Sequence, residues 1–127
     1  MSDRKLQHLI ESYVQAYNQF DIAAMLRDFS DNCTFSSISG GIQTIFCQNK
    51  MELHKFAEQS AAYFKERTQT ITNWILGDDK AAIEIQYKAI LNRDLPNGYK
   101  AGQELNLQGV SVFAFRDGKI ISLIDYS

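Results

Sequence analysis

The sequence is poor in proline and cysteine and has no long hydrophobic run. One proline and seven glycines among 127 residues exclude collagen-like and low-complexity classes. No apolar run approaches the roughly 18 residues of a membrane-spanning helix, so we expect no membrane insertion. Thirteen basic side chains against fifteen acidic ones leave a net charge of −2. Without a clustered positive field, we expect no nucleic-acid partner.

The two cysteines, Cys33 and Cys47, stand at a spacing that matches no metal-binding pattern. The start of the chain is amphipathic and charged, unlike a secretory signal. We therefore expect both thiols to be reduced and to lie in or near the core of a cytoplasmic protein. His8 and His54 have no clustered partner and are interpreted as surface residues, so no metal site is expected.

Apolar residues, 45% of the chain, follow a helical period through much of its first half. Residues 3–18 carry one apolar stripe and predict the first helix. Asp21 is a typical cap for a shorter helix ending at about Phe29. Asn49 is a second cap and predicts a third helix to about Lys65. The stripe of the first helix consists of Leu6, Leu9, Ile10, Tyr13, Val14 and Tyr17.

Later in the chain the apolar period changes from 3.6 to 2, which is typical of strands. Asp117-Gly118 between two apolar runs predicts a hairpin. Helices that mostly precede strands predict a single α+β domain over residues 1–127, with a cone-shaped, curved antiparallel sheet wrapped around three N-terminal helices. The expected strands are 33–38, 69–76, 81–91, 102–115 and 119–126, and residues 42–47 are either a further short strand or an ordered loop.

A long curved sheet that covers helices leaves space at its open end, so we expect a conical, mainly apolar pocket there. The segment 110–115 is apolar on both faces. One face can line the pocket, and no fourth long helix is predicted to cover the other. We therefore expect a homodimer formed through the outer sheet face.

Three short phrases, in this order, resemble the SnoaL-like family of the nuclear transport factor 2-like (NTF2-like), or ketosteroid isomerase-like, superfamily over nearly the whole chain. They are residues 13–21 (YVQAYNQFD), 29–35 (FSDNCTF) and 113–120 (FAFRDGKI), the last followed by Asp125-Tyr126. The resemblance implies the cone-shaped fold described above. It leaves function open, because the superfamily includes polyketide cyclases, steroid isomerases, epoxide hydrolases and binding modules without activity.

By resemblance to the steroid isomerases, Tyr13 falls where those enzymes place a tyrosine that donates to an enolate. Ser37 falls where they place the general base, and Ser111 about where they place a protonated aspartate. A serine without an activating histidine cannot replace a carboxylate base near neutral pH. The isomerase mechanism is therefore not expected.

Asp125 resembles one aspartate of the Asp–Arg–Asp arrangement in epoxide hydrolases. For the other two residues of that arrangement the chain offers only the adjacent pair Arg93-Asp94. Neighbours on a strand point to opposite faces, so these two side chains cannot both enter one pocket. By resemblance to the cyclases, Asp125 is an acid/base that needs no cofactor, so no cofactor is expected. An apolar pocket would raise the pKa of such a carboxyl.

The candidate catalytic residues are therefore Asp125 as acid/base and Tyr13 as donor. Each also has a plainer interpretation: Tyr13 as a core side chain, and Asp125 as a solvated strand end or a dimer contact. The candidate ligand-binding residues are Tyr17, Phe35, Ser37, Phe56, Trp74, Tyr87, Ser111, Phe113 and Leu123.

Three functions remain open at this stage. The first is a protein that binds a small apolar ligand in a conical pocket. The second is a cofactor-free cyclase, isomerase or hydrolase acting through Asp125 and Tyr13. The third is a protein–protein module whose interior is filled by aromatic side chains. An enclosed cavity of roughly 300 Å³ or more that contains the Asp125 carboxyl would favour the first two.

Overall fold

The computed structural model describes residues 1–127 and has three helices and six strands. The helices come early in the chain and the longest strands late, so the predicted α+β class is confirmed. The helices are α1 (Asp3–Asn18), α2 (Ile22–Leu26) and α3 (Lys50–Ala61). The strands are β1 (Phe29–Ser39), β2 (Ile42–Cys47), β3 (Phe64–Leu76), β4 (Lys80–Leu91), β5 (Glu104–Arg116) and β6 (Lys119–Tyr126).

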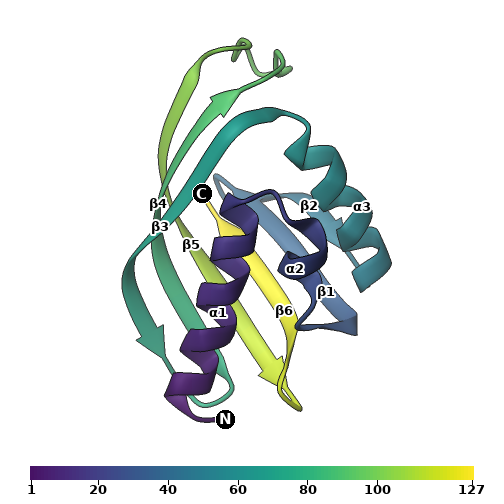
Figure 1. Cartoon of the computed structure of the whole chain (residues 1–127), viewed down its shortest axis with the longest axis vertical. Coiled ribbons are helices and arrows are strands. Elements are labelled where there is room, and N and C mark those ends of the chain that lie inside the picture. The colour runs from purple at the N-terminus through teal and green to yellow at the C-terminus, as the bar shows by residue number, and fades with distance from the viewer.

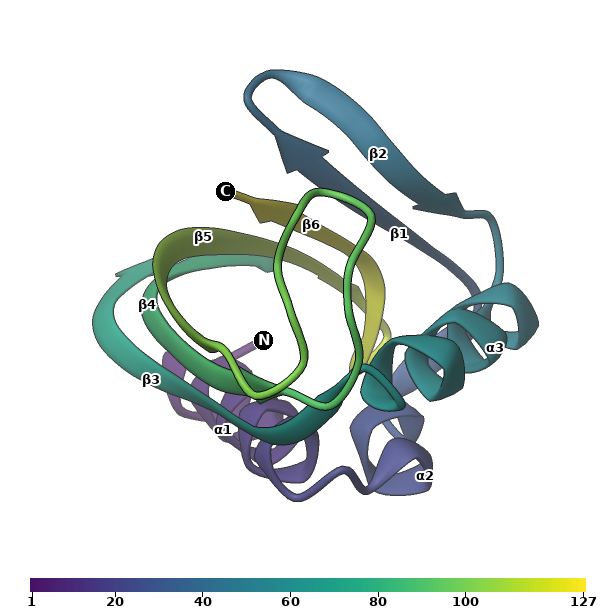
Figure 2. The same cartoon turned by 90° about the horizontal axis from the view of Figure 1, so that it is seen from above.

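The six strands form one sheet in the order β2-β1-β6-β5-β4-β3. The sheet bends into an arc, and the helices lie along its concave side (Figures 1 and 2). The expectation of a purely antiparallel sheet was wrong, because β1 and β6 run parallel. The last strand enters between β1 and β5 instead of adding to an edge, and this insertion makes the sheet mixed.

Each helix begins at a capping side chain that satisfies a backbone N–H of its first turn. Ser2 Oγ accepts from Lys5 N at 3.2 Å, Asp21 Oδ1 from Ala24 N at 3.1 Å, and Asn49 Oδ1 from Glu52 N at 2.9 Å. Two of these caps, Asp21 and Asn49, were predicted from the sequence.

Two predicted boundaries were wrong. The third helix ends at Ala61, and Phe64 already begins β3 because it pairs with Leu91 of β4. The short second helix likewise ends early, and β1 begins at Phe29. The polar residues 30–32 lie within β1, where the pairing with β6 shifts register between Phe29 and Thr34. This irregularity lets a strand carry side chains that look like a loop in the sequence.

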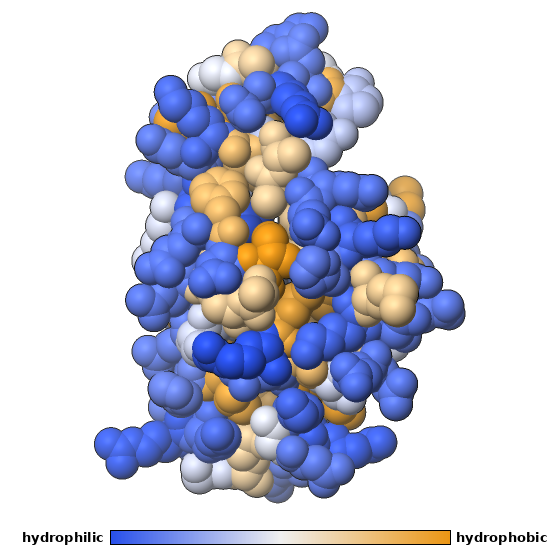
Figure 3. Space-filling model, turned by 45° about the vertical axis from the view of Figure 1, so that its right-hand side comes forward, coloured by the Kyte–Doolittle hydropathy of each residue, from blue (hydrophilic) through white to orange (hydrophobic).

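The main core lies between α1 and the concave face of the sheet. Its fully buried side chains come from α1 and from the strands β1, β4, β5 and β6. On the side of the molecule from which Figure 3 is drawn, apolar atoms reach the surface in a central strip between hydrophilic margins. The largest fully buried side chains include Leu6, Ile10, Phe29, Ile83, Phe113 and Leu123.

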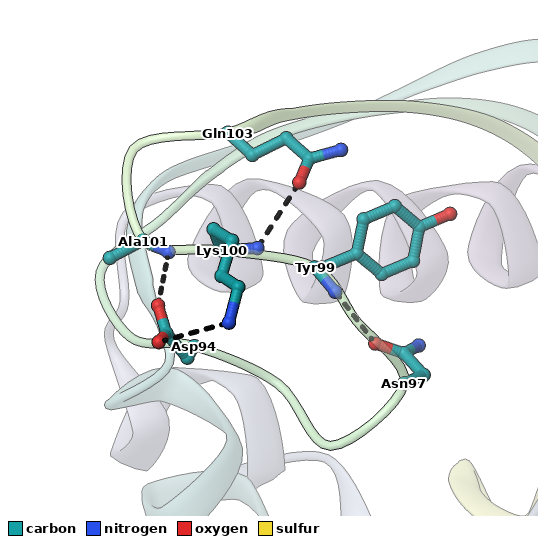
Figure 4. A network of polar contacts seen from close by, with 6 residues as sticks. All are labelled: Asp94, Asn97, Tyr99, Lys100, Ala101 and Gln103. Atoms are coloured by element: carbon teal, nitrogen blue, oxygen red, sulfur yellow. Dashed lines mark hydrogen bonds and ion pairs between the residues drawn. The ribbon is translucent and has the colours of Figure 1, made fainter.

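A second, smaller core lies towards the loop between β4 and β5, where Leu95 and Tyr99 pack against it. Asp94 stabilises this loop, since its Oδ1 accepts from Ala101 N at 2.8 Å and its Oδ2 lies 3.7 Å from Lys100 Nζ (Figure 4). The loop therefore has a defined shape at the end of the sheet. None of the three helices is both long and apolar enough to cross a membrane.

Candidate functional site

A cavity of about 220 Å³ lies against the concave face of the sheet, between α1, α3 and the ends of β5 and β6. Seven of its fifteen lining residues are hydrophobic, so its wall is half polar. Its volume lies below the range of roughly 300–1,000 Å³ that is typical of drug-sized ligands. A ligand of one or two rings is the size that this cavity suits.

The Asp125 carboxyl lies in the wall of this cavity. Strand pairing sets Asp125 opposite Ser111 on β5 and Ser37 on β1, and all three side chains point inwards. Ser111 Oγ donates a hydrogen bond to Asp125 Oδ1 at 2.7 Å. Burial raises the pKa of Asp125 to about 6, and the Ser111 hydrogen bond opposes this rise. The carboxyl can therefore exchange a proton near neutral pH.

Another part of the cavity wall carries hydroxyl and amide groups. Tyr17 of α1 and Tyr87 of β4 share a hydrogen bond of 2.9 Å between their hydroxyl oxygens. Burial raises the pKa of both phenols. The neighbouring Gln69 of β3 also lines the cavity, and Phe64 lies edge-on to Tyr87 at 6.2 Å. The cavity thus has an acidic side and a phenolic side.

Arg67 is buried behind the phenolic side and has no carboxylate partner. Its guanidinium lies 3.7 Å from the ring centroid of Tyr17 and 4.4 Å from that of Phe20. Its Nε donates to the Tyr17 carbonyl oxygen at 2.9 Å, near the negative end of α1. This cation lowers the pKa of the Tyr17 phenol, although burial outweighs it. Arg67 was not singled out from the sequence.

Tyr13 lies next to the cavity but does not line it. Its ring packs against Phe29 and Phe113, at 5.7 Å and 5.8 Å between centroids, and it is only 7% exposed. Burial and then the charge of Asp125 raise the pKa of Tyr13 well above the ordinary value. Tyr13 is therefore close enough to Asp125 to sense its charge.

The structure brings together five of the eleven candidate residues in the cavity wall and places the other six in the surrounding core. Phe35 and Phe56 stack on each other at 5.6 Å. Trp74 of β3 pairs with Ile83 and packs against the main core. The five residues in the wall are Tyr17, Ser37, Tyr87, Ser111 and Asp125. The six outside it are Tyr13, Phe35, Phe56, Trp74, Phe113 and Leu123.

Sequence reasoning missed several lining residues at the wide end of the cavity. Gln69 and Leu107 reach it because strand pairing places them beside Tyr87. Phe64 reaches it from the start of β3, where the sequence predicted a helix. Period-2 alternation from Tyr87 through the β3–β4 pairing is the signal that could have found Gln69. The missed residues are Ser60, Phe64, Gln69, Ile85, Leu107, Gln108, Gly109, Val110, Tyr126 and Ser127.

The pair Arg93-Asp94 lies away from this cavity, in the loop after β4, where Asp94 binds Ala101 and Lys100. An Asp–Arg–Asp arrangement therefore does not form around Asp125. No three histidine, cysteine, aspartate or glutamate side chains are gathered as a metal site would require.

A larger, outer hollow of about 560 Å³ lies beside the same strands and adjoins the inner cavity. The two hollows share six lining residues: Ile85, Gln108, Gly109, Val110, Tyr126 and Ser127. Its one carboxylate, Glu84, accepts from Asn73 Nδ2 at 2.7 Å in an exposed position. Because this hollow lacks a buried ionisable group, the inner cavity is the candidate site.

A mixed sheet curved around helices, with a carboxyl in the wall of the cavity on its concave face, has the architecture of an NTF2-like protein. A model of the SnoaL-like domain matches residues 10–123, and the chain belongs to this family. No curated protein matches the sequence.

Solved structures share the fold over nearly the whole chain. A candidate polyketide cyclase from Pseudomonas putida is 21% identical, with a TM-score of 0.75 over 94% of this chain and 88% of that chain. A protein from Catenulispora acidiphila with a ketosteroid isomerase-like fold, in complex with trimethylamine, is 16% identical, with a TM-score of 0.76 over 94% and 84%. TerC, co-crystallized with polyporic acid, is 14% identical, with a TM-score of 0.76 over 95% and 89%.

Proposed function

We propose that this chain, acting over residues 1–127 as one domain, binds a small and mainly apolar molecule in the inner cavity. The observation that carries the proposal is the Asp125 carboxyl, held by Ser111 at 2.7 Å in the wall of a partly open cavity. Phe64 and Ile85 offer apolar surface for the body of the ligand. Two proteins of the same fold, one in complex with trimethylamine and one co-crystallized with polyporic acid, support the proposal.

A second candidate function is cofactor-free acid/base catalysis of the cyclase, isomerase or hydrolase type. The raised pKa of Asp125, about 6, favours it, because proton transfer is most efficient when the pKa is near the working pH. Asp125 would take or give the proton. Tyr13 would act as donor from beside Asp125, and Tyr17 is the phenol that contacts the cavity itself.

Ligand titration followed by ¹⁵N-resolved NMR tests the binding proposal. We expect small aromatic ketones and quinones to shift the amide signals of Ser37, Ser111 and Asp125 in a saturable manner. Ile85→Trp should abolish these shifts by filling the cavity, whereas Glu84→Gln, on the outer hollow, should leave them unchanged. Shifts confined to the outer hollow, or no saturable shift with any compound, would contradict the proposal.

Asp125→Asn separates binding from catalysis. The asparagine keeps the size of the side chain and removes its proton exchange. If the protein is an enzyme, the variant should keep its affinity for the ligand and lose turnover. If wild-type protein turns over no member of a carbonyl and epoxide panel that it binds, the binding function stands alone.

We further propose that the outer face of the sheet pairs with a second copy of the chain. One row of paired positions runs across all six strands on this face. Its side chains are apolar on five of the strands, and β1 contributes a serine. Ile75 and Phe46, at the two edges of the sheet, are 56% and 53% exposed. The elements of this chain leave the row uncovered, and a second copy presents the same complementary row. The row consists of Ile75, Ala82, Val112, Ile124, Ser36 and Phe46.

A cytoplasmic location remains part of the proposal. Cys33 and Cys47 are both buried and unpaired. Burial raises the pKa of each thiol, so neither is a reactive thiolate. Two such thiols are typical of proteins in a reducing compartment.

A further inference from the structure

Gln69 has an unusual position among the polar residues of the cavity. It is only 8% exposed and lines the inner cavity beside Tyr17 and Tyr87. Its Oε1 is the one buried side-chain nitrogen or oxygen atom in the chain without a hydrogen-bond partner. Buried acceptors in native proteins almost always have a partner, because an unsatisfied one destabilises the fold.

The backbone of Gln69 is fixed, so its side chain cannot be moved to the surface by a local shift. Asn18, at the end of α1, binds this residue twice: its Nδ2 donates to Gln69 O at 3.1 Å, and its Oδ1 accepts from Gln69 N at 2.8 Å. These two bonds also satisfy the outer edge of β3, which is the last strand of the sheet. Pairing with Tyr87 on β4 then directs the Gln69 side chain inwards.

The amide group of Gln69 lies beside the phenol of Tyr17. This neighbour and the Tyr87 hydroxyl both lower the pKa of Tyr17. Oε1 of Gln69 has no hydrogen-bond partner in the chain and remains a free acceptor. An apolar side chain of the same length would fill the position without an unsatisfied atom.

We infer that Gln69 Oε1 is a specificity-determining acceptor, and that the ligand of the cavity presents a hydroxyl or N–H group to it. The inference rests on the proposed binding function and adds a chemical class to it: a small ring compound with a hydrogen-bond donor at the phenolic end. Asp125 lines the same cavity, so the same ligand can also contact the carboxyl.

Two probes that differ in one hydrogen-bond donor test this inference. 2-Naphthol carries a hydroxyl group that can donate, and 2-methoxynaphthalene carries a methoxy group that cannot. We expect wild-type protein to bind 2-naphthol roughly tenfold more tightly, the effect of one satisfied buried group. Gln69→Met, which keeps the length of the side chain, should reduce the ratio of affinities to about one. Gln15→Met, on the exposed face of α1, should leave the ratio unchanged.

The wild-type comparison stands without any variant. Equal affinity of wild-type protein for the two probes would overturn the inference and leave the binding proposal intact. Retention of the preference in Gln69→Met would overturn it as well. If neither probe nor any aromatic ketone or quinone binds, the binding proposal itself fails, and this inference fails with it.

Thermal unfolding gives a second readout that needs no ligand. Because Gln69→Met removes an unsatisfied acceptor, we expect its melting temperature to equal or exceed that of wild type. A clear fall in melting temperature would show that Oε1 has a structural partner and would overturn the inference.

Discussion

Asp125 links the stability of the fold to pH through a single carboxyl. Burial raises its pKa from 3.8 to about 6. Between these two values the folded chain holds a proton that the unfolded chain has released. The free energy of unfolding therefore falls as the pH rises through this window, and the loss is complete above about pH 6.

Asp125→Asn should be more stable than wild type at about pH 7, by up to roughly 3 kcal/mol. The difference should shrink as the pH falls and should vanish below roughly pH 3, where the wild-type carboxyl is protonated in both states. Urea denaturation at several pH values measures it. Asp117→Asn, in the exposed β5–β6 turn, is the matched control and should show no such trend. A stability difference between Asp125→Asn and wild type that does not vary with pH would contradict the raised pKa of Asp125.

The Tyr17–Tyr87 hydrogen bond joins α1 to β4 across 70 residues of sequence. Tyr17→Phe and Tyr87→Phe should each destabilise the fold by about 1 kcal/mol, because each leaves the other hydroxyl without its partner. The double variant should lose little more than either single variant. A double-mutant cycle in urea measures this coupling. Tyr126→Phe, at an exposed tyrosine, provides the control, and additive losses would show that the two hydroxyls act independently.

At the scale of elements, α3 depends on its first turn. Asn49→Ala removes the side-chain acceptor for Glu52 N and should lower the free energy of unfolding by about 1 kcal/mol. Chemical denaturation measures the loss. Asn32→Ala, at an exposed position in β1, changes the same residue type and should have an effect near zero. Equal losses from the two variants would mean that the cap does not determine the stability of α3.

The elements differ in how well the sequence predicts them, and the reason is physical. The helix over 3–18 follows from one apolar stripe, and the β5–β6 hairpin follows from Asp117-Gly118, which both adopt positive φ. The start of β1 could not be predicted, since residues 30–32 are polar and only the irregular pairing with β6 makes them strand. The first residues of β3 looked helical because Phe64 continued the stripe of α3.

At the scale of the whole molecule, the outer sheet face should determine oligomeric state. Val112 lies in the middle of the apolar row across this face. We expect light scattering to give wild type a mass of twice 14.5 kDa, and Val112→Arg a mass near 14.5 kDa, because a charge cannot be buried there without a partner. Gln86→Arg, on the polar part of the same face, should not change the mass. A wild-type mass near 14.5 kDa at micromolar concentration would exclude the dimer.

The cavity was harder to predict than the fold. Strand alternation predicted that Asp125 and Ser111 share one face, and the two residues pair in register. Ser37 was a candidate from the family resemblance, and it pairs with Asp125 on the other side. Which aromatic residues line the cavity and which fill the core depends on how far the sheet curves. Phe113 and Phe35 point inwards as expected but are covered by neighbouring rings. Sequence patterns predict which face of the sheet a side chain lies on. They do not predict whether an inward side chain lines the cavity or is covered by its neighbours.

The position of the single tryptophan has a practical consequence. Trp74 packs against the main core from β3, whereas the cavity wall holds Tyr17 and Tyr87 and no indole. The fluorescence of Trp74 should therefore report global unfolding and should not change when a ligand binds in the cavity. Tyrosine absorbance and emission should respond to that occupant. The chain thus carries two separate optical probes: the tryptophan reports whether it is folded, and the tyrosines report whether the cavity holds a ligand.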